Sequence, residues 1–298
     1  MADSGHMSPV SRGRKGKNKK QQVREAESVA SPELGALDLD AVDVGIDRSG
    51  FEGMIDDIEA TIARLADVDD PVDGEYLAAS LLAATYGTPE YDEPFASMFI
   101  EEALRQAGPG GVAFLQCIAA LTPEPSRTAA LEAADRLAAT GVEAPAWVAE
   151  LARPVTAGEY LRWTTADGQG SVLYGSFERA GRADGVLLFI DDEDCGAAND
   201  LAPFIGEGLA EARRLTDERE SSSGEPIAAD EFRWQVEAAL AARALHERAA
   251  LELGIEPEEP EDEDDVPHEV TDVVLRARLR TLPMSAKPLP VHVHPGVS

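Results

Sequence analysis

The chain has 298 residues, of which 44% are hydrophobic and 5% aromatic, and its formal net charge is −31. A hydrophobic fraction of this size is ordinary for a globular protein, which excludes a chain that is disordered throughout. The sequence contains no secretory apolar region and no run of about 18 apolar residues, so we expect no membrane span and a cytoplasmic protein.

The charge is unevenly distributed along the chain. Residues 1–24 carry seven basic side chains and one acidic side chain, so the remaining chain carries −37. Because so acidic a body repels phosphate groups, we expect the folded part to bind neither nucleic acid nor anionic membranes. A nucleic-acid contact is then expected only at an N-terminal arm, whose basic residues are Arg12, Arg14, Lys15, Lys17, Lys19 and Lys20. The alternative is that this arm is a solubilising end.

Residues 1–50 are predicted to form a disordered basic tail, because the stretch is poor in apolar residues and punctuated by glycine. Its first residues, MADSGHM, are typical of a tag remnant. The region 51–154 is predicted to be helical, and residues 112–121 are so apolar that they indicate a buried central helix. An apolar stripe with helical spacing marks the first helix: Ile55, Ile58, Ile62 and Leu65. No fixed sequence period is present, so a bundle is favoured over a repeat array.

The β pattern is concentrated in the region 155–254, which is predicted to combine a meander with helices. Three short strands are expected, at residues 160–163, 172–179 and 186–190. The last of them, VLLFI, is apolar throughout, which is typical of a strand buried on both faces.

Helices are expected to follow the meander. A first helix, weakened by Pro203, is predicted over residues 199–215, and 230–253 shows the clearest helical pattern of the chain. An acidic, proline-containing linker is expected at 255–267, a C-terminal helix at 268–283 and an extended tail at 284–298. The sequence therefore predicts a mainly helical α+β fold: a helical N-terminal region packed with a small antiparallel meander of about three strands and C-terminal helices.

An acidic turn follows the apolar strand and offers a candidate metal site. Hard cations such as Mg²⁺ or Ca²⁺ prefer several oxygen ligands from one short loop. The candidate ligands are Asp191, Asp194 and Asp200. The turn does not fit a calcium-binding hand, because Cys195 and Ala202 occupy the fifth and twelfth positions. The alternative is a solvated turn in which Asp200 lies near the N-terminus of the next helix.

The sequence shows no catalytic constellation. It contains no Gly-x-Ser-x-Gly motif and no phosphate-binding glycine loop, and no histidine is adjacent to a suitable nucleophile. We therefore expect no cofactor and a non-enzymatic protein-binding or scaffold protein, whose partner pairs with a sheet edge or lies against the helices. The alternatives are a Mg²⁺- or Ca²⁺-dependent enzyme or regulator that uses the acidic turn, and a nucleic-acid-associated protein that uses the basic arm.

Several local runs and their order give the chain a resemblance to a known group of proteins. The runs are AASLLAATYG, GVAFLQCIAAL, ALEAADRLAATGVEAPAWVAEL, SVLYGSFER, GVLLFIDDEDCGAANDL and VVLRARLRTLP. Over most of residues 75–283, the chain resembles an uncharacterised actinobacterial family of hypothetical proteins. The resemblance implies matching positions at Asp191, Gly196 and Asp200, while Asp192, Glu193 and Asp194 depart from the family pattern. It implies no activity.

Overall fold

The structure is a computed structural model that describes residues 48–292, except residues 87, 89–90, 193–194 and 256–265. The predicted basic arm and most of the predicted acidic linker lie outside these residues. Within them, the predicted α+β class is confirmed: helices precede and follow an antiparallel sheet, and the chain is mainly helical. None of the described helices is both long and apolar enough to cross a bilayer.

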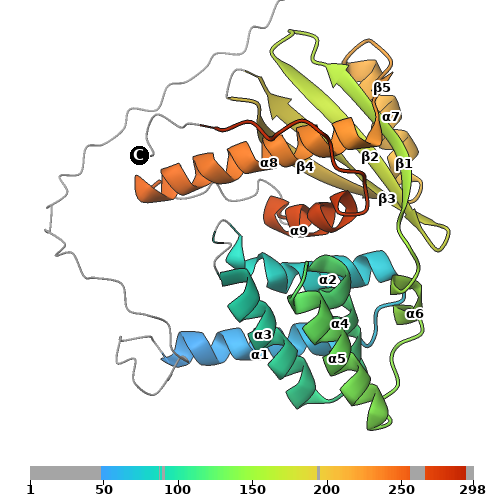
Figure 1. Cartoon of the computed structure of the whole chain (residues 1–298), viewed down its shortest axis with the longest axis vertical. Coiled ribbons are helices and arrows are strands. Elements are labelled where there is room, and N and C mark those ends of the chain that lie inside the picture. Colours follow the sequence, from blue (N-terminus) through green and yellow to red (C-terminus); the bar gives the residue numbers. More distant parts are fainter. Residues whose placement is uncertain (1–47, 87, 89–90, 193–194, 256–265, 293–298) are drawn as a thin grey trace, which may run out of the picture. The chain divides into compact units, whose positions relative to one another are not determined.

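The N-terminal helices pack around one apolar helix (Figure 1). The elements are α1 (Arg48–Arg64), α2 (Pro71–Leu82), the short 3₁₀ helix η1 (Ala83–Thr85), α3 (Asp92–Gln106), α4 (Pro109–Leu121), α5 (Ser126–Ala139) and α6 (Val148–Leu151). The helix predicted to be central is α4, in which Phe114, Leu115 and Ile118 are fully buried. Its environment confirms the interpretation of the apolar run as a buried helix.

Local chemistry fixes the start of α2. The Asp70 carboxylate accepts a hydrogen bond from the backbone N–H of Val72 at 2.8 Å, and Pro71 occupies the first helical position. A side-chain oxygen at this position satisfies one of the amides that a helix leaves unpaired at its N-terminus. Proline is favoured there because its missing N–H would be unpaired anyway. This cap places Glu75 in the first turns of α2, where it becomes important below.

The sheet has five antiparallel strands rather than the predicted three or so. They are β1 (Thr156–Thr164), β2 (Gly170–Arg179), β3 (Arg182–Asp191), β4 (Ala197–Ile205) and β5 (Glu225–Pro226), in the spatial order β4-β3-β2-β1-β5. The helix predicted over residues 199–215 forms only in its later part, because β4 occupies residues 199–205 and the helix begins at Gly208. Pairing with the apolar β3, in which Leu188 lies opposite Leu201, outweighs local helix propensity. Pro203 is tolerated because β4 is an edge strand.

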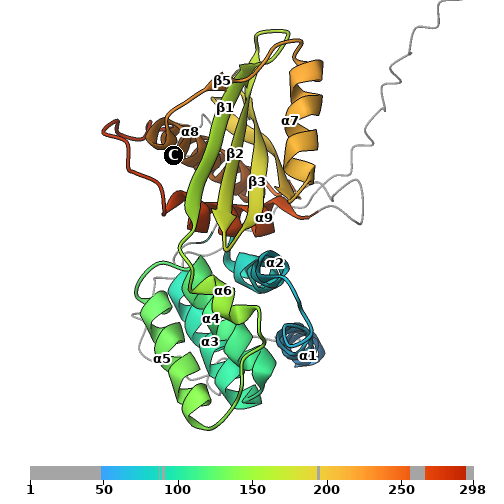
Figure 2. The same cartoon turned by 90° about the vertical axis from the view of Figure 1, so that its right-hand side faces the viewer.

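Helices cover both faces of the sheet (Figure 2). On one face, α8 (Ala229–Glu252) and α9 (His268–Leu279) pack against Leu173, Phe177 and Leu188. On the other face, α7 (Gly208–Arg219) packs against Trp163 and Leu187. The helices predicted within 230–253 and 268–283 are thus α8 and α9.

Helix α9 belongs to two cores at once. Val270, Val274 and Ala277 pack into the core of the N-terminal helices, whereas Leu275 and Leu279 pack into the core beneath the sheet. Burial of apolar area stabilises by about 25 cal/mol per Å². The two buried faces of α9 therefore join the helical region to the sheet, and a polar residue between them has no route to solvent.

Candidate functional site

The structure describes two of the three predicted metal ligands, Asp191 and Asp200. Asp191 ends β3, with its backbone opposite Gly170 and Ala197, and Asp200 lies within β4 opposite Phe189. Asp194 lies outside the described residues, as does the basic arm. In the described part of the chain, no three His, Cys, Asp or Glu side chains are grouped so as to hold a metal ion. The Mg²⁺ or Ca²⁺ site remains a prediction.

Asp200 is a strand residue and not a helix cap, since α7 begins only at Gly208. Its carboxylate accepts a hydrogen bond from the backbone N–H of Leu201 at 2.7 Å. The Arg243 guanidinium of α8 donates to the carbonyl oxygens of Ala198 at 3.2 Å and Asn199 at 2.8 Å. Pro203 supplies no N–H. These groups occupy or remove backbone sites along edge strand β4, which disfavours pairing with a foreign strand there.

The chain also contains a buried ionic cluster that the sequence did not reveal. Arg278 of α9 donates to both carboxylate oxygens of Glu75, at 3.0 and 2.5 Å, and to Asp184 of β3 at 2.8 Å. Arg179 of β2 lies 2.9 Å from Glu75. The side chains of Arg278 and Glu75 are 2% and 0% exposed. Two cations and two carboxylates thus balance in charge between α2, α9 and the β2–β3 hairpin.

Opposing effects act on the two carboxyl groups of this cluster. Burial alone would raise the pKa of Glu75, but Arg278 and Arg179 more than offset it and hold that pKa below its ordinary value. Burial raises the pKa of Asp184, and the attraction of Arg278 offsets this only in part. Because the cluster is closed to solvent, we assign it a structural role and not a binding role.

The sequence did contain a signal for Arg278. Val274 and Leu275, at positions −4 and −3 on α9, are both buried. On a helix, those positions share a face with Arg278. An arginine surrounded by apolar neighbours at helical spacing indicates a buried partner. Its carboxylate partners, 94 and 203 positions away, carry no such signal.

A cavity of about 900 Å³ lies where η1, the C-terminal half of α8 and the start of α9 meet. We call it the α8–α9 cleft. Its charged and aromatic lining consists of Tyr86, Arg243, Glu247, Arg248, His268 and Glu269. A neighbouring hollow of about 450 Å³ shares Tyr86 and Arg248 with the cleft and is also lined by Asp272 and Arg276. Ligand sites in proteins commonly measure about 300–1,000 Å³, so this cleft is the candidate functional site.

The charged groups of the cleft contact one another. The Nε2 atom of His268 lies 2.9 Å from a Glu247 oxygen, and its Nδ1 atom lies 3.5 Å from Glu269. Arg243 donates to the same Glu247 oxygen at 2.8 Å. The Tyr86 ring meets the His268 ring edge-on, with centroids 5.3 Å apart. The cluster thus joins Tyr86, α8 and α9 through a ring contact and through the contacts of His268 with Glu247 and Glu269.

Burial and neighbouring charges shift the pKa values of Glu247 and Tyr86 in this cluster. Burial would raise the pKa of Glu247, but hydrogen bonds from His268 and Arg243 hold it below the ordinary 4.5. Burial, together with the charges of Glu247 and Asp272, raises the pKa of Tyr86 far above its ordinary 10. At neutral pH, Glu247 is therefore a carboxylate and Tyr86 a neutral phenol.

His268 is engaged in contacts and Cys117 is buried, and these are side chains whose chemistry suits a general base and a nucleophile, respectively. Both ring nitrogens of His268 already lie beside carboxylates, so the ring is poorly placed to take a proton from a ligand. The Cys117 thiol is buried in α4, and burial raises its pKa well above 9.0. A thiol in such surroundings is a poor nucleophile.

The lowered pKa of Glu247 predicts a pH-dependent contribution to stability. A carboxyl group whose pKa is lowered in the folded state stabilises the fold when the pH is above its pKa in the unfolded chain, here about 4.5. This stabilisation is lost as the pH falls through the pKa of the folded state. Because Glu247 is partly exposed, we expect Glu247→Gln to lower the free energy of unfolding by only about 1 kcal/mol at pH 7. The difference should shrink below pH 4.5. Urea denaturation at pH 7 and pH 4 measures it.

Exposed Glu252 on the same helix provides the matched control. Glu252→Gln should leave the urea midpoint unchanged at both pH values. A pH-independent loss in Glu247→Gln would contradict the ionic role of Glu247.

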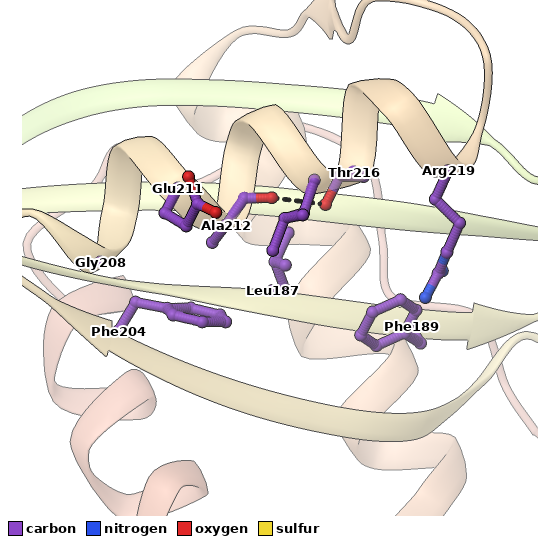
Figure 3. Close-up of a pocket in the computed structure, with 9 residues that line it drawn as sticks. Leu187, Phe189, Phe204, Gly208, Glu211, Ala212, Thr216 and Arg219 are labelled. Carbon is purple, nitrogen blue, oxygen red and sulfur yellow. Dashed lines mark hydrogen bonds between the residues drawn. The ribbon is translucent and has the colours of Figure 1, made fainter.

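A further hollow lies on the face of the sheet that α7 covers (Figure 3). It measures about 250 Å³ and is lined mainly by Leu187, Phe189, Phe204 and residues of α7. The Arg219 guanidinium lies 4.6 Å from the Phe189 ring centroid and closes one end, as Figure 3 shows. The Thr216 hydroxyl donates to the Ala212 carbonyl of its own helix and is therefore engaged. This hollow is smaller than common ligand sites and offers few polar groups.

Sequence reasoning did not single out the cleft residues. Glu247 and His268 are separated by the acidic linker, and neither has a distinctive local pattern. They meet only because α8 and α9 pack beneath the same sheet.

In comparisons with protein-family models, curated proteins and solved structures, the chain shows no significant match. The resemblance to the actinobacterial family therefore remains a prediction, and the functional argument depends on the geometry of the cleft.

Proposed function

We propose that the protein is a non-enzymatic binding protein that holds a segment of a partner protein in the α8–α9 cleft. One observation supports this most directly: the cavity is large enough for several side chains, and Glu247 on its wall already contacts Arg243 and His268. A pocket of this kind selects a ligand by shape and by a few fixed polar contacts.

Apolar side chains at the cleft support a protein partner. Leu251 and Ile255 line the cavity and are 61% and 56% exposed. Ala83, Ala84 and Val270 extend the apolar surface across η1 and α9. Exposed apolar residues grouped beside a cavity are typical of protein interaction sites. The strongly acidic body would steer a basic partner towards the molecule.

A substitution that fills the cleft tests this function. Ala84 is exposed at the cleft, and Ala129 is equally exposed on α5, outside its lining. We expect Ala84→Trp to reduce capture of a specific partner from a lysate of the source organism at least tenfold. Ala129→Trp should capture as much as the parent chain. Quantitative mass spectrometry measures the retained proteins.

Two outcomes would contradict the proposal. Equal capture by all three chains would place the partner away from the cleft. The absence of any protein retained specifically by the parent chain would count against a protein-binding function altogether. Unchanged urea midpoints in both variants would show that the substitutions leave the fold intact.

A further inference from the structure

After α9, the chain turns back and its C-terminal segment runs along α8 (Figure 1). Trp234 and Glu231 attach Lys287 and Pro288 of this segment to the first turns of that helix. The indole Nε1 of Trp234 donates to the carbonyl oxygen of Pro288 at 2.9 Å. The Lys287 ammonium lies 4.9 Å from the Trp234 ring centroid and forms an ion pair with Glu231. We call Glu231 and Trp234 the α8 face.

These contacts match the chemistry by which proteins recognise proline-containing segments. Such segments are extended and leave carbonyl oxygens free, and an aromatic surface with an N–H donor can bind them. A lysine next to the proline adds a cation–π contact and an ion pair. The α8 face therefore distinguishes a lysine-proline segment from other extended segments.

The attachment of the chain's own segment is weak. The Lys287 side chain is 55% exposed, and Met284 and Val291 are 78% and 90% exposed. An exposed ion pair typically contributes about 0–1 kcal/mol. The covalent link supplies an effective concentration on the order of millimolar, which holds a weak ligand in place without strong contacts. A separate chain with a better segment can therefore displace it.

We propose that the α8 face binds a lysine-proline segment of a partner protein, and that residues 283–292 occupy it as a displaceable internal ligand. Charge supports this occupant, because Glu231 and the acidic body favour a basic segment. Hydrogen bonds from Lys287 and Gln235 hold the pKa of Glu231 below its ordinary value, so Glu231 is ionised at neutral pH. The α8 face lies at the opposite end of α8 from the cleft, so it is a second interaction surface.

The test uses a fluorescent synthetic peptide with the sequence of residues 283–292, PMSAKPLPVH, and full-length chains. In a Lys287→Glu chain, the internal ligand carries the wrong charge and should leave the α8 face. We expect this chain to bind the peptide at least tenfold more tightly than the parent chain does, measured by fluorescence anisotropy. Binding should weaken as the salt concentration rises.

Matched variants identify the surface. Adding either Trp234→Phe or Glu231→Gln to the Lys287→Glu chain should weaken peptide binding about two- to fivefold, and a peptide with glutamate in place of its lysine should bind more weakly than the original peptide. Equal affinity of the parent and Lys287→Glu chains would overturn the proposal, because the segment would then be a fixed part of the fold. Self-association of the parent chain that Trp234→Phe abolishes would make a second copy the occupant and would also overturn it.

Discussion

Replacement of Arg278 by methionine is expected to lower the free energy of unfolding by about 3–5 kcal/mol. The reason is the buried ionic cluster: without Arg278, the carboxylates of Glu75 and Asp184 remain in the interior, and Arg179 is the cation of the cluster that is left. Methionine retains much of the apolar volume, so the loss reports mainly on charge. Urea denaturation at pH 7 measures it, with an expected total stability of about 5–15 kcal/mol for a domain.

Arg214 provides the control for this experiment. It forms ion pairs with Glu211 and Glu218 on α7, but all three side chains are about half exposed or more. Because water solvates the carboxylates left behind, Arg214→Met should produce no measurable change. A comparable loss in both variants would show that burial is not the cause.

The pH dependence of the Arg278→Met chain gives an independent check. Without its principal cation, each buried carboxyl group should have a folded-state pKa above its unfolded value. A group with a raised folded-state pKa stabilises the fold when the pH is below its pKa in the unfolded chain, and this stabilisation is lost as the pH rises through the folded-state pKa. The difference in stability between parent and variant should therefore be smaller at pH 4 than at pH 7. A constant difference would indicate a packing defect instead.

Periodicity accounts for the parts of the fold that the sequence predicts well. The apolar run of α4 and the VLLFI run of β3 predict buried elements, because burial depends directly on side-chain type. The error at β4 has the opposite origin. The sequence of residues 199–215 predicts a helix despite Pro203, whereas a strand forms over its first part because β3 offers a long apolar partner. Pairing between segments is a tertiary effect that a local pattern does not contain.

The candidate site was less predictable than the fold. The carboxylates of the acidic turn are adjacent in sequence and therefore predict a site, whereas the cleft combines residues from η1, α8 and α9. Tyr86 and His268 are 182 positions apart and meet edge-on only in the folded chain. Adjacency in sequence is a visible signal, while convergence of distant elements requires the tertiary fold.

Phe232 is expected to be the side chain on which the position of α8 depends most. It is fully buried, stacks on Tyr160 at 4.6 Å between ring centroids, and covers Gly175 of β2. Phe232→Ala should lower the free energy of unfolding by about 3–5 kcal/mol, through lost burial and the cavity left behind. Half-buried Phe204 is the control, and Phe204→Ala should cost clearly less. If the Phe232→Ala chain does not fold, Phe232→Leu serves as the milder variant.

Gly175 makes the role of Phe232 testable as a pairwise interaction. A methyl group built on Gly175 would overlap the Phe232 ring, so Gly175→Ala alone should cost about 1–3 kcal/mol through overpacking. In the Phe232→Ala chain the space for that methyl group is free. The double variant should therefore be more stable than the sum of the two losses predicts, by about 1–2 kcal/mol. Strict additivity in urea denaturation would mean that the ring and the glycine are not in direct contact, and that another contact positions α8 on the sheet.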